Sequence, residues 1–256
     1  DGTDIIDKEY KELCAEMYSK GHSFFTYISD SADSLASCCR LRNELAENTF
    51  SPTSGLTGVK TGSCNVISLN MNRIIQDWAN NYRETMDGMD SADMYVFYAP
   101  SSGFRPYLES ILERVYKYHI AYKTMLYEWE DKKMFASSNG GYINIKDLFS
   151  TVGINGLNEA AEYMGLTVSN NPEYIRFLQE ILGTIKECNK VHSINDKKRP
   201  FLFNSEVVPA EGLGVKNYNW DKEDGYWVPS DRNLYNSYFY NAHDNTSVLD
   251  KFILHG

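Results

Sequence analysis

The chain has 256 residues, of which 42% are hydrophobic, and a formal net charge of −10 at pH 7. That length and apolar content suffice for one large or two small domains with a real core, while the acidic balance argues against a nucleic-acid partner, which normally needs clustered Lys and Arg. The sequence has no apolar run of about 18 residues that would span a membrane and does not open as a signal peptide, so we expect a cytoplasmic protein.

The cysteines are five in number and scattered, a pattern typical of a reducing compartment. They are Cys14, Cys38, Cys39, Cys64 and Cys188. No pair has CxxC spacing and no Cys/His cluster has zinc spacing, so no structural metal is expected within these residues.

The first quarter of the chain predicts a short helix, a strand and a loop. Apolar residues recur at helical spacing over residues 5–20, and Gly21 would end that helix. Residues 23–28 are aromatic and β-branched, as in a strand. The Ser-rich stretch 28–37 has neither the helical nor the two-residue period and therefore predicts a loop that carries the adjacent Cys38 and Cys39.

The remaining sequence alternates strands with helices. Strands are expected at 65–70, 142–145, 201–204 and 206–208, and helices at 74–82, 105–135 and 172–190. A glycine turn over 153–160 should enter a further helix that ends near Gly165. The tail 209–256 is rich in Gly, Asn, Tyr and Asp. This order predicts an α/β layered or barrel architecture in one structural unit.

Cys39, followed by Arg40, could act as a nucleophile or as a hydrogen-atom donor, although a free cysteine is commonly a small buried hydrophobe. A Cys–His hydrolase would need a histidine base, and none of the five histidines has a recognisable local signature. They are His22, His119, His192, His243 and His255. His119 lies within the long predicted helix, where a core or surface imidazole is the simpler interpretation.

Two glycine turns are candidate binding elements, and the first could face an anion through free backbone N–H groups at a helix start. The first, 153–159, leads to Glu159, which would either complement the helix dipole or line a pocket. The second, 208–216, brings a carboxylate and an ammonium close together, but its spacing alone favours a solvated surface loop.

Taken in order, five motifs resemble the anaerobic, class III ribonucleotide reductases. They are Ser37-Cys38-Cys39-Arg40-Leu41, Leu56-Thr57-Gly58, residues 66–74, residues 153–160, and Val208-Pro209-Ala210-Glu211. The resemblance covers roughly residues 24–256, and several separated motifs in one order are far more specific than any single one.

The resemblance implies a glycyl radical enzyme on a ten-stranded α/β barrel made of two five-stranded halves, with a central finger loop. Here the finger loop would span about residues 29–42, followed by the second half-barrel. In this family the thiyl-radical cysteine precedes an Arg, which selects Cys39, with Cys38 a packed neighbour. The Cys39 thiyl would abstract the ribose 3′ hydrogen, the 2′ hydroxyl would leave as water, and the hydrogen would be returned.

The resemblance also implies the substrate-binding residues. Ser63, Cys64 and Asn65 would lie near the ribose on the strand after the finger loop. Asn155, Asn158, Glu159 and Glu211 would lie on turns that face the same pocket, and the helix beginning near Leu157 could receive the phosphates.

The sequence departs from the family at two places. Most members have Gly-Val-Val where this chain has Asn65-Val66-Ile67, and a Pro where it has Asn72. Cys64 is also unexpected beside the ribose. It would be either a redox-active thiol that supplies electrons or a packed cysteine.

The family's four-cysteine zinc site and its Arg-Val-Cys-Gly-Tyr radical loop do not occur in this sequence, and no amino-terminal half-barrel is recognised. We therefore expect a split subunit or a fragment that is inactive alone and binds no cofactor itself. The glycyl radical would come from another segment, generated by an iron-sulfur activating enzyme that uses S-adenosylmethionine.

The expected partners are a ribonucleoside tri- or diphosphate, formate or a dithiol as reductant, the remaining segments of the reductase, and a second copy in a homodimer of the full enzyme. Two alternatives stay open. One is a non-catalytic relic or interaction subunit of a split reductase. The other is a different glycyl radical enzyme, such as a formate-lyase relative, which the combined motifs fit less well.

Overall fold

The computed structural model describes residues 7–20, 34–36, 42–44, 62–85, 94–100, 103–208, 211–241 and 246–255. Where the sequence predicted one unit, the contacts divide the chain into two, residues 1–58 and 59–256. None of the described helices is long and apolar enough to cross a membrane.

The first unit contains helix α1 (Lys8–Ser19) and an antiparallel strand pair, β1 (Ser34–Ala36) with β2 (Arg42–Glu44). Helix α1 begins where the Asp7 carboxylate accepts a hydrogen bond from the Tyr10 N–H, an N-cap that satisfies a free backbone donor. β1 replaces part of the predicted loop, because its three residues pair with β2. The predicted strand at 23–28 lies outside the described residues.

The second unit is built on a three-stranded parallel sheet in the order β3-β4-β5, comprising β3 (Gly62–Asn70), β4 (Leu148–Asn155) and β5 (Leu202–Val207). Its helices, in chain order, are α2 (Met71–Thr85), α3 (Met94–Phe97), α4 (Phe104–Asp131), α5 (Ala136–Asn139), α6 (Leu157–Tyr163), α7 (Pro172–His192), α8 (Glu211–Glu223) and α9 (Val248–His255). This confirms the predicted alternation of strands and helices.

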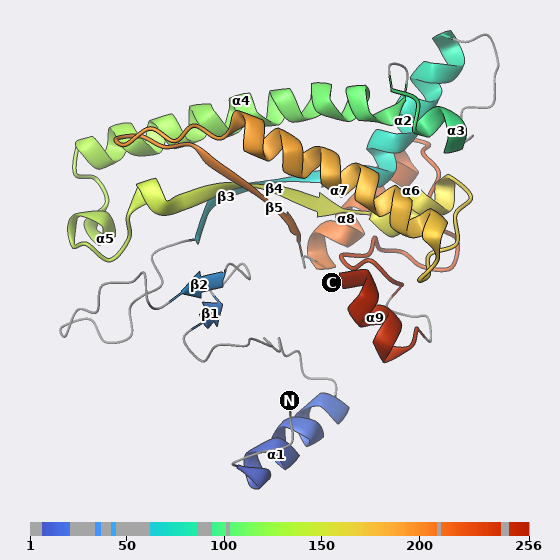
Figure 1. Ribbon diagram of the computed structural model, residues 1–256, viewed down its shortest axis with the longest axis horizontal. Helices are drawn as coiled ribbons and strands as arrows, with labels where there is room; N and C mark the ends of the chain where they lie inside the picture. The colour runs from blue at the N-terminus through green and yellow to red at the C-terminus, as the bar shows by residue number, and fades with distance from the viewer. Residues whose placement is uncertain are drawn as a thin grey trace. The chain divides into compact units, whose positions relative to one another are not determined.

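Helices α4 and α7 run side by side along the sheet (Figure 1). Buried side chains recur every three or four residues along α4, as the apolar spacing predicted. The Asn171 side chain caps α7 by accepting a hydrogen bond from the Tyr174 N–H. Pro172 fits the first turn, because a residue there has no helical acceptor for an N–H and proline has no N–H to satisfy.

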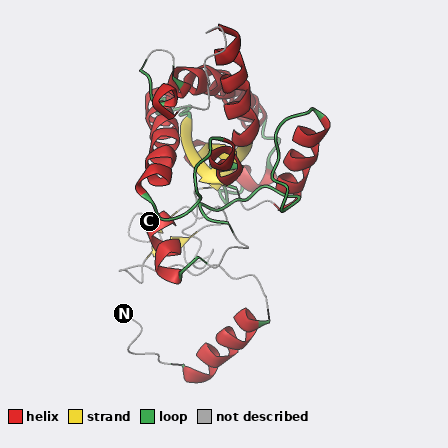
Figure 2. Cartoon of the chain, turned by 90° about the vertical axis from the view of Figure 1, so that its right-hand side faces the viewer, coloured by secondary structure: helices red, strands yellow, loops and turns green. Residues whose placement is uncertain are grey.

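The core lies between this sheet and its helices and is strongly aromatic. Figure 2 shows the strands lying among the helices of this unit. Phe97 stacks on Phe104 with ring centroids 5.0 Å apart, and Trp78 meets both rings edge-on. Phe177 of α7 approaches Phe97 at 5.3 Å, so that α2, α3, α4 and α7 share one apolar cluster.

Successive residues of β4 serve opposite faces of the sheet. Val152 and Ile154 are buried in the cluster shared with α4 and α7. Gly153 therefore faces the other side, where a Cβ would lie 2.5 Å from the Ser68 Oγ and 2.9 Å from the Val66 Cγ1. The side chains of β3 fill the space above this glycine. We call this side the open face of the sheet, because Val66 is 43% exposed there.

Three local predictions were wrong. Residues 142–145 do not form a strand, since a 3-10 helix at Ile145–Asp147 precedes β4 and Asn144 caps it. Residues 153–155 continue β4, so the turn before α6 is shorter than expected.

The second glycine turn is likewise not a surface loop, because α8 begins at Glu211. Gly214 within this helix lies against the backbone of Tyr235, and a Cβ there would come within 2.6 Å of the Tyr235 carbonyl oxygen. Gly214 thus permits this close approach instead of marking a loop.

Core burial in α7 can be tested with two substitutions on the same helix. Ile181 is fully buried, whereas Val191 is 79% exposed. We expect Ile181→Ala to lower the free energy of unfolding by about 3 kcal/mol, because it removes buried methyl groups and leaves a cavity. Val191→Ala should stay within about 0.5 kcal/mol of the parent chain. Urea unfolding followed by circular dichroism measures both, and equal losses would contradict the described core.

Candidate functional site

The carboxyl ends of the parallel strands meet at one edge of the sheet, where Asn70 of β3 and Asn155 of β4 are register partners. In open α/β sheets, ligands bind outside this edge. The tail residues 226–241 also reach this edge, as their hydrogen bonds show below, and the structure holds them there with two buried carboxylates.

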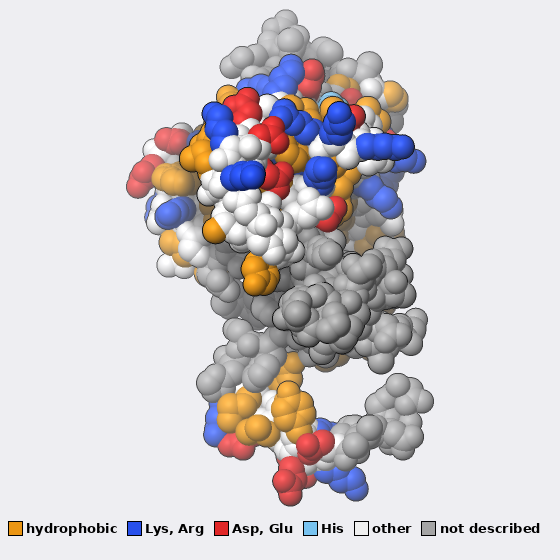
Figure 3. Space-filling model, turned by 90° about the vertical axis from the view of Figure 1, so that its left-hand side faces the viewer, with side chains coloured by type: hydrophobic (Ala, Val, Ile, Leu, Met, Phe, Trp, Pro, Cys, Tyr) orange, Lys and Arg blue, Asp and Glu red, His pale blue; other side chains and the backbone are white. Residues whose placement is uncertain are grey.

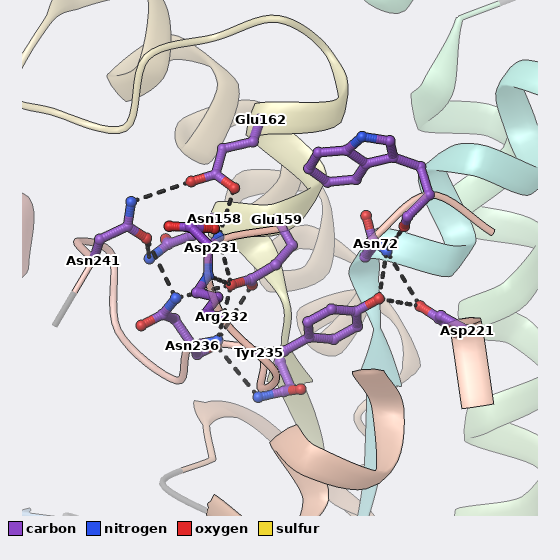
Figure 4. A network of polar contacts seen from close by, with 12 residues as sticks. Asn72, Asn158, Glu159, Glu162, Asp221, Asp231, Arg232, Tyr235, Asn236 and Asn241 are labelled. Atoms are coloured by element: carbon purple, nitrogen blue, oxygen red, sulfur yellow. Dashed lines mark hydrogen bonds and ion pairs between the residues drawn. The ribbon is translucent and has the colours of Figure 1, made fainter. Parts of the chain in front are cut away.

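The first buried carboxylate is Glu159, in the first turn of α6 (Figure 4). Its Oε1 accepts from the Arg232 Nε at 3.1 Å and Nη2 at 2.9 Å, and from the Asn236 Nδ2 at 2.8 Å. The Asn236 backbone N–H donates to both carboxylate oxygens at 3.2 Å. These donors compensate the cost of burying a charge and fix the tail to α6.

Both members of this ion pair are shielded from water, with Glu159 fully buried and the Arg232 side chain only 5% exposed. Burial raises the pKa of the Glu159 carboxyl, against the opposing charge of Arg232. Burial also disfavours the Arg232 cation, but its hydrogen bonds and charge interactions with Glu162 and Glu159 raise its pKa above the usual range. The guanidinium therefore stays charged and requires its acidic partners.

Asn155 and Asn158 are buried beside this pair and also bind tail or helix residues. The Asn155 amide donates to the Asn236 carbonyl at 3.3 Å and accepts from the Asn217 Nδ2 at 2.9 Å. Asn158 accepts from the Tyr174 hydroxyl at 2.8 Å and donates to the Asn241 Oδ1 at 3.3 Å. Their polar groups are thus occupied within the chain.

The second buried carboxylate is Asp221 of α8, which gathers donors from three parts of the chain. It accepts from the Arg73 Nε at 2.7 Å, the Asn70 Nδ2 at 2.9 and 3.0 Å, and the Tyr235 hydroxyl at 2.7 Å. Asn72 donates to the same carboxylate at 3.2 Å and to Tyr235 at 2.7 Å. Burial and the hydrogen bond to Asp221 raise the pKa of the Tyr235 phenol, which stays protonated.

A short row of polar side chains crosses the open face of the sheet. The Ser63 hydroxyl is hydrogen-bonded to the Thr151 hydroxyl, and Thr151 in turn donates to the Asn204 Oδ1 at 2.7 Å. We call these three residues the polar row. Each comes from a different strand, so only the sheet brings them together.

Cys64 and Asn65 face α4, on the other side of the sheet from Ser63. The Cys64 Sγ lies 3.6 Å from the Ser150 Oγ, and Ser150 neighbours Thr151 on the opposite face of β4. The Asn65 Nδ2 lies 2.8 Å from the Nδ1 of His119 in α4. A β-bulge between Ser63 and Asn65 causes this change of side.

Two buried bases of α4 lie beneath Cys64 and Asn65. Burial lowers the pKa of His119 to about 4, so the imidazole is neutral, and its core placement agrees with the simpler interpretation of the sequence. The Lys123 Nζ donates to the Leu148 carbonyl at 2.5 Å, and burial lowers its pKa against the opposing effect of the Cys64 thiol. Cys64 packs against Leu126 and Tyr127, as expected of a packed cysteine.

The predicted substrate residues therefore do not share one pocket. Ser63 is on the open face, while Cys64 and Asn65 face α4. Asn155, Asn158 and Glu159 are at most 1% exposed and hold the tail.

The helix start proposed for phosphates is covered as well. The Gly156 N–H donates to the Asn236 carbonyl at 3.2 Å, and the Glu159 carboxylate lies in the first turn, where it disfavours an anion.

Three residues of the predicted site motifs have side chains outside the described part of the structure. Cys38 and Cys39 fall between β1 and β2, outside the described residues, and the Glu211 side chain is also outside them. Among the described residues, no three His, Cys, Asp or Glu side chains are placed to hold a metal ion.

Sequence reasoning missed Thr151, Asn204, Asp221, Arg232, Tyr235 and Asn236. The abundance of Asn, Tyr and Asp in the tail was the only signal for Asp221, Tyr235 and Asn236, and Thr151, Asn204 and Arg232 had none.

The geometry defines a class: a parallel α/β unit with a polar open face and tail residues fixed at the carboxyl ends of its strands. Over residues 1–256 the sequence matches the family described as "Anaerobic ribonucleoside-triphosphate reductase". The chain belongs to this family. No curated protein sequence gives a match.

Solved structures of anaerobic ribonucleotide reductases have a similar fold. The enzyme from Thermotoga maritima with glycerol in the active site is 23% identical, with a TM-score of 0.61 over 88% of this chain and 34% of that chain. The same enzyme in complex with dATP and CTP gives 21% identity and a TM-score of 0.57 over 75% and 29%.

A further structure described as an anaerobic ribonucleotide reductase gives 21% identity and a TM-score of 0.59 over 75% and 28%. The chain thus spans about a third of the length of these proteins.

The structure shows what Asn65 and Asn72 do at the two positions where the sequence departs from most members of the family. Asn72, at the position where most members have Pro, uses its amide to bind Asp221, Tyr235 and the Trp227 carbonyl, although its Oδ1 has no partner among the described residues. Asn65, in place of a Gly, binds His119. Each added side chain is held by a partner inside the fold.

The role of the Glu159–Arg232 pair can be measured through stability. We expect Glu159→Gln to lower the free energy of unfolding by about 3 kcal/mol, because it leaves a buried guanidinium with less compensating charge. Asp231→Asn is the matched control, since Asp231 contacts the same guanidinium at 2.9 Å but is 72% exposed. It should cost less than about 1 kcal/mol. Urea unfolding measures the free energy for both variants. An equal loss in Asp231→Asn and Glu159→Gln would contradict the stabilising role of the buried ion pair.

Burial of neutral His119 predicts a pH dependence. Its folded pKa of about 4 lies below the ordinary value of 6.5, so the unfolded chain takes up the proton first as pH falls. The contribution of neutral His119 to the free energy of unfolding is complete above pH 6.5 and falls by about 3 kcal/mol between pH 6.5 and pH 4. His119→Gln keeps a polar partner for Asn65 and should make the loss of stability over this range smaller. An unchanged pH profile in the variant would show that His119 is not the group responsible.

Proposed function

We propose that this chain is a catalytic part of an oxygen-sensitive ribonucleotide reductase, which converts ribonucleotides to 2′-deoxyribonucleotides for DNA synthesis. The observation that carries the proposal is the family match over residues 1–256. The parallel sheet, similar to part of the solved reductases, supports it. Because the chain spans about a third of those proteins, we assign it the reaction only together with the remaining segments of the enzyme.

Cys39 is the proposed radical residue, since it precedes Arg40 in the motif that the family uses. Cys39 loses its thiol hydrogen to a glycyl radical on another segment, which an iron-sulfur activating enzyme generates with S-adenosylmethionine. The Cys39 thiyl then takes the 3′ hydrogen of the ribose, and the 2′ hydroxyl leaves as water with one added proton. Formate or a dithiol supplies two electrons, and a second proton completes the new C2′–H bond. Return of the hydrogen to C3′ restores the thiyl.

The open face is the proposed side for the ribose. Ser63 and Asn204 of the polar row are half-buried there, and their hydroxyl and amide groups can hydrogen-bond a sugar, whereas Thr151 between them is fully buried. Glu211, the first residue of α8, stays a proposed substrate contact. For Asn155, Asn158 and Glu159 we propose a positioning role through the tail, because their polar groups are occupied by tail and helix residues.

The packing of Cys64 favours a reductant other than the Cys64 thiol as the source of electrons. Its Sγ approaches Ser150 and Asn65 on the helix side of the sheet, away from Ser63. Cys14 and Cys188 are the other free cysteines of the described part, and Cys188 belongs to the margin of the core.

The test is Cys39→Ala in the anaerobically reconstituted reductase, with Cys38→Ala as the matched control. We expect Cys39→Ala to lower deoxynucleotide formation by at least about 10³-fold, because the variant lacks the thiol to which we assign the thiyl radical, while Cys38→Ala keeps most of the activity. The glycyl radical signal in electron paramagnetic resonance confirms activation of each sample. Product formation by Cys39→Ala with a full radical signal would exclude Cys39.

The same reconstitution separates the two functional hypotheses. A parent complex that forms product supports the reductase. An assembled complex that neither binds ribonucleotide nor carries a radical would support a non-catalytic interaction subunit instead.

A further inference from the structure

A hollow of about 800 Å³ lies at the amino end of β4 and near that of β5, beside the last turn of α4. It is lined by Tyr127, Glu130, Asp131, Ser138, Gly141, Ile143, Asn144, Lys146, Asp147, Lys198 and Arg199. Because Asp147 directly precedes the first residue of β4, the hollow is at the opposite end of this strand from Asn155. It is therefore separate from the proposed ribose side, and its function does not rest on the proposed reaction.

Hydrogen bonds within and between three segments fix the walls of the hollow. The Tyr127 hydroxyl donates to the Pro200 carbonyl at 2.6 Å and thus ties α4 to the segment before β5. The Asp196 carboxylate accepts from the backbone N–H groups of Lys198 and Arg199, both at 2.8 Å. The Asn144 Nδ2 donates to Asp147 at 2.9 Å. A site held in this way is preformed, which reduces the entropy cost of binding.

The acidic side chains of the hollow already have partners. Asp131 pairs with Arg199 at 2.5 Å, Glu130 accepts from the Ser138 hydroxyl, and Asp147 accepts from Asn144. Figure 3 shows acidic and basic side chains close together over the part of the chain on this side.

Unlike these acidic side chains, the lysines of the hollow are not engaged: neither Lys146 nor Lys198 has an ion-pair partner among the described residues. Both lie close enough to Asp196 to help its backbone donors lower the pKa of that carboxyl. Lys146 and Lys198 therefore bring two ammonium groups without a described ion pair to one hollow, whose carboxylates Glu130, Asp131 and Asp147 have other partners.

We propose that this hollow binds a small phosphate-bearing organic molecule, with the phosphate between Lys146 and Lys198 and the organic part along Ile143 and the edge of Tyr127. A phosphate offers several charged acceptor oxygens to ammonium donors. Ile143 is 44% exposed and supplies apolar surface at the wall. The volume lies in the range of about 300–1,000 Å³ that is typical of small-molecule sites.

The experiment titrates the 256-residue chain with phenyl phosphate and with inorganic phosphate at low ionic strength, using isothermal calorimetry. We expect phenyl phosphate to bind more tightly, because it alone reaches the apolar wall. The double variant Lys146→Met/Lys198→Met should weaken binding at least about tenfold, since two charge-assisted contacts are lost.

The matched control is Lys132→Met/Lys197→Met. It removes the same charge from two exposed lysines that are next in sequence to lining residues but do not line the hollow themselves. This control should bind like the parent chain. Equal weakening in both double variants, or no binding of either probe at about 10 mM, overturns the proposal. Equal affinity for the two probes overturns the part assigned to Ile143 and Tyr127.

Discussion

The ion pair between Glu159 and Arg232 is the interaction on which the strand-end architecture depends. A carboxylate removed from water is stable only when donors surround it, and Arg232 and Asn236 provide them from the tail. The pair therefore couples the first turn of α6 to a segment more than seventy residues later. With the tail fixed in this way, Asn155 and Asn158 obtain partners and the end of β4 becomes rigid.

Asp221 does the same for β3, and it explains why the chain tolerates an unusual residue. Asn70, Arg73 and Tyr235 converge on this carboxylate, and Asn72 joins them where the family commonly has Pro. A proline would offer no amide to this network. The substitution thus adds polar contacts in a place where a buried charge needs donors.

The sheet presents distinct environments on its two faces and at its two ends. The open face carries the polar row, the helix side carries Lys123 and the neutral His119, and the amino end carries Lys146 and Lys198. The proposed ribose side and the proposed phosphate site therefore lie in different parts of the sheet and can be tested separately. The charge distribution, more than the fold class, distinguishes these regions.

The sequence alone determined the alternation of strands and helices, the long α4 and α7, and the family, because apolar periodicity and ordered motifs are local properties. It identified Glu159 but not its partner, since Arg232 lies in a tail without periodicity. It also placed Ser63 and Asn65 together, although a bulge turns them to opposite sides of the sheet. Tertiary structure alone decided these points, because side-chain direction and long-range pairing depend on register and packing, which adjacent residues do not encode.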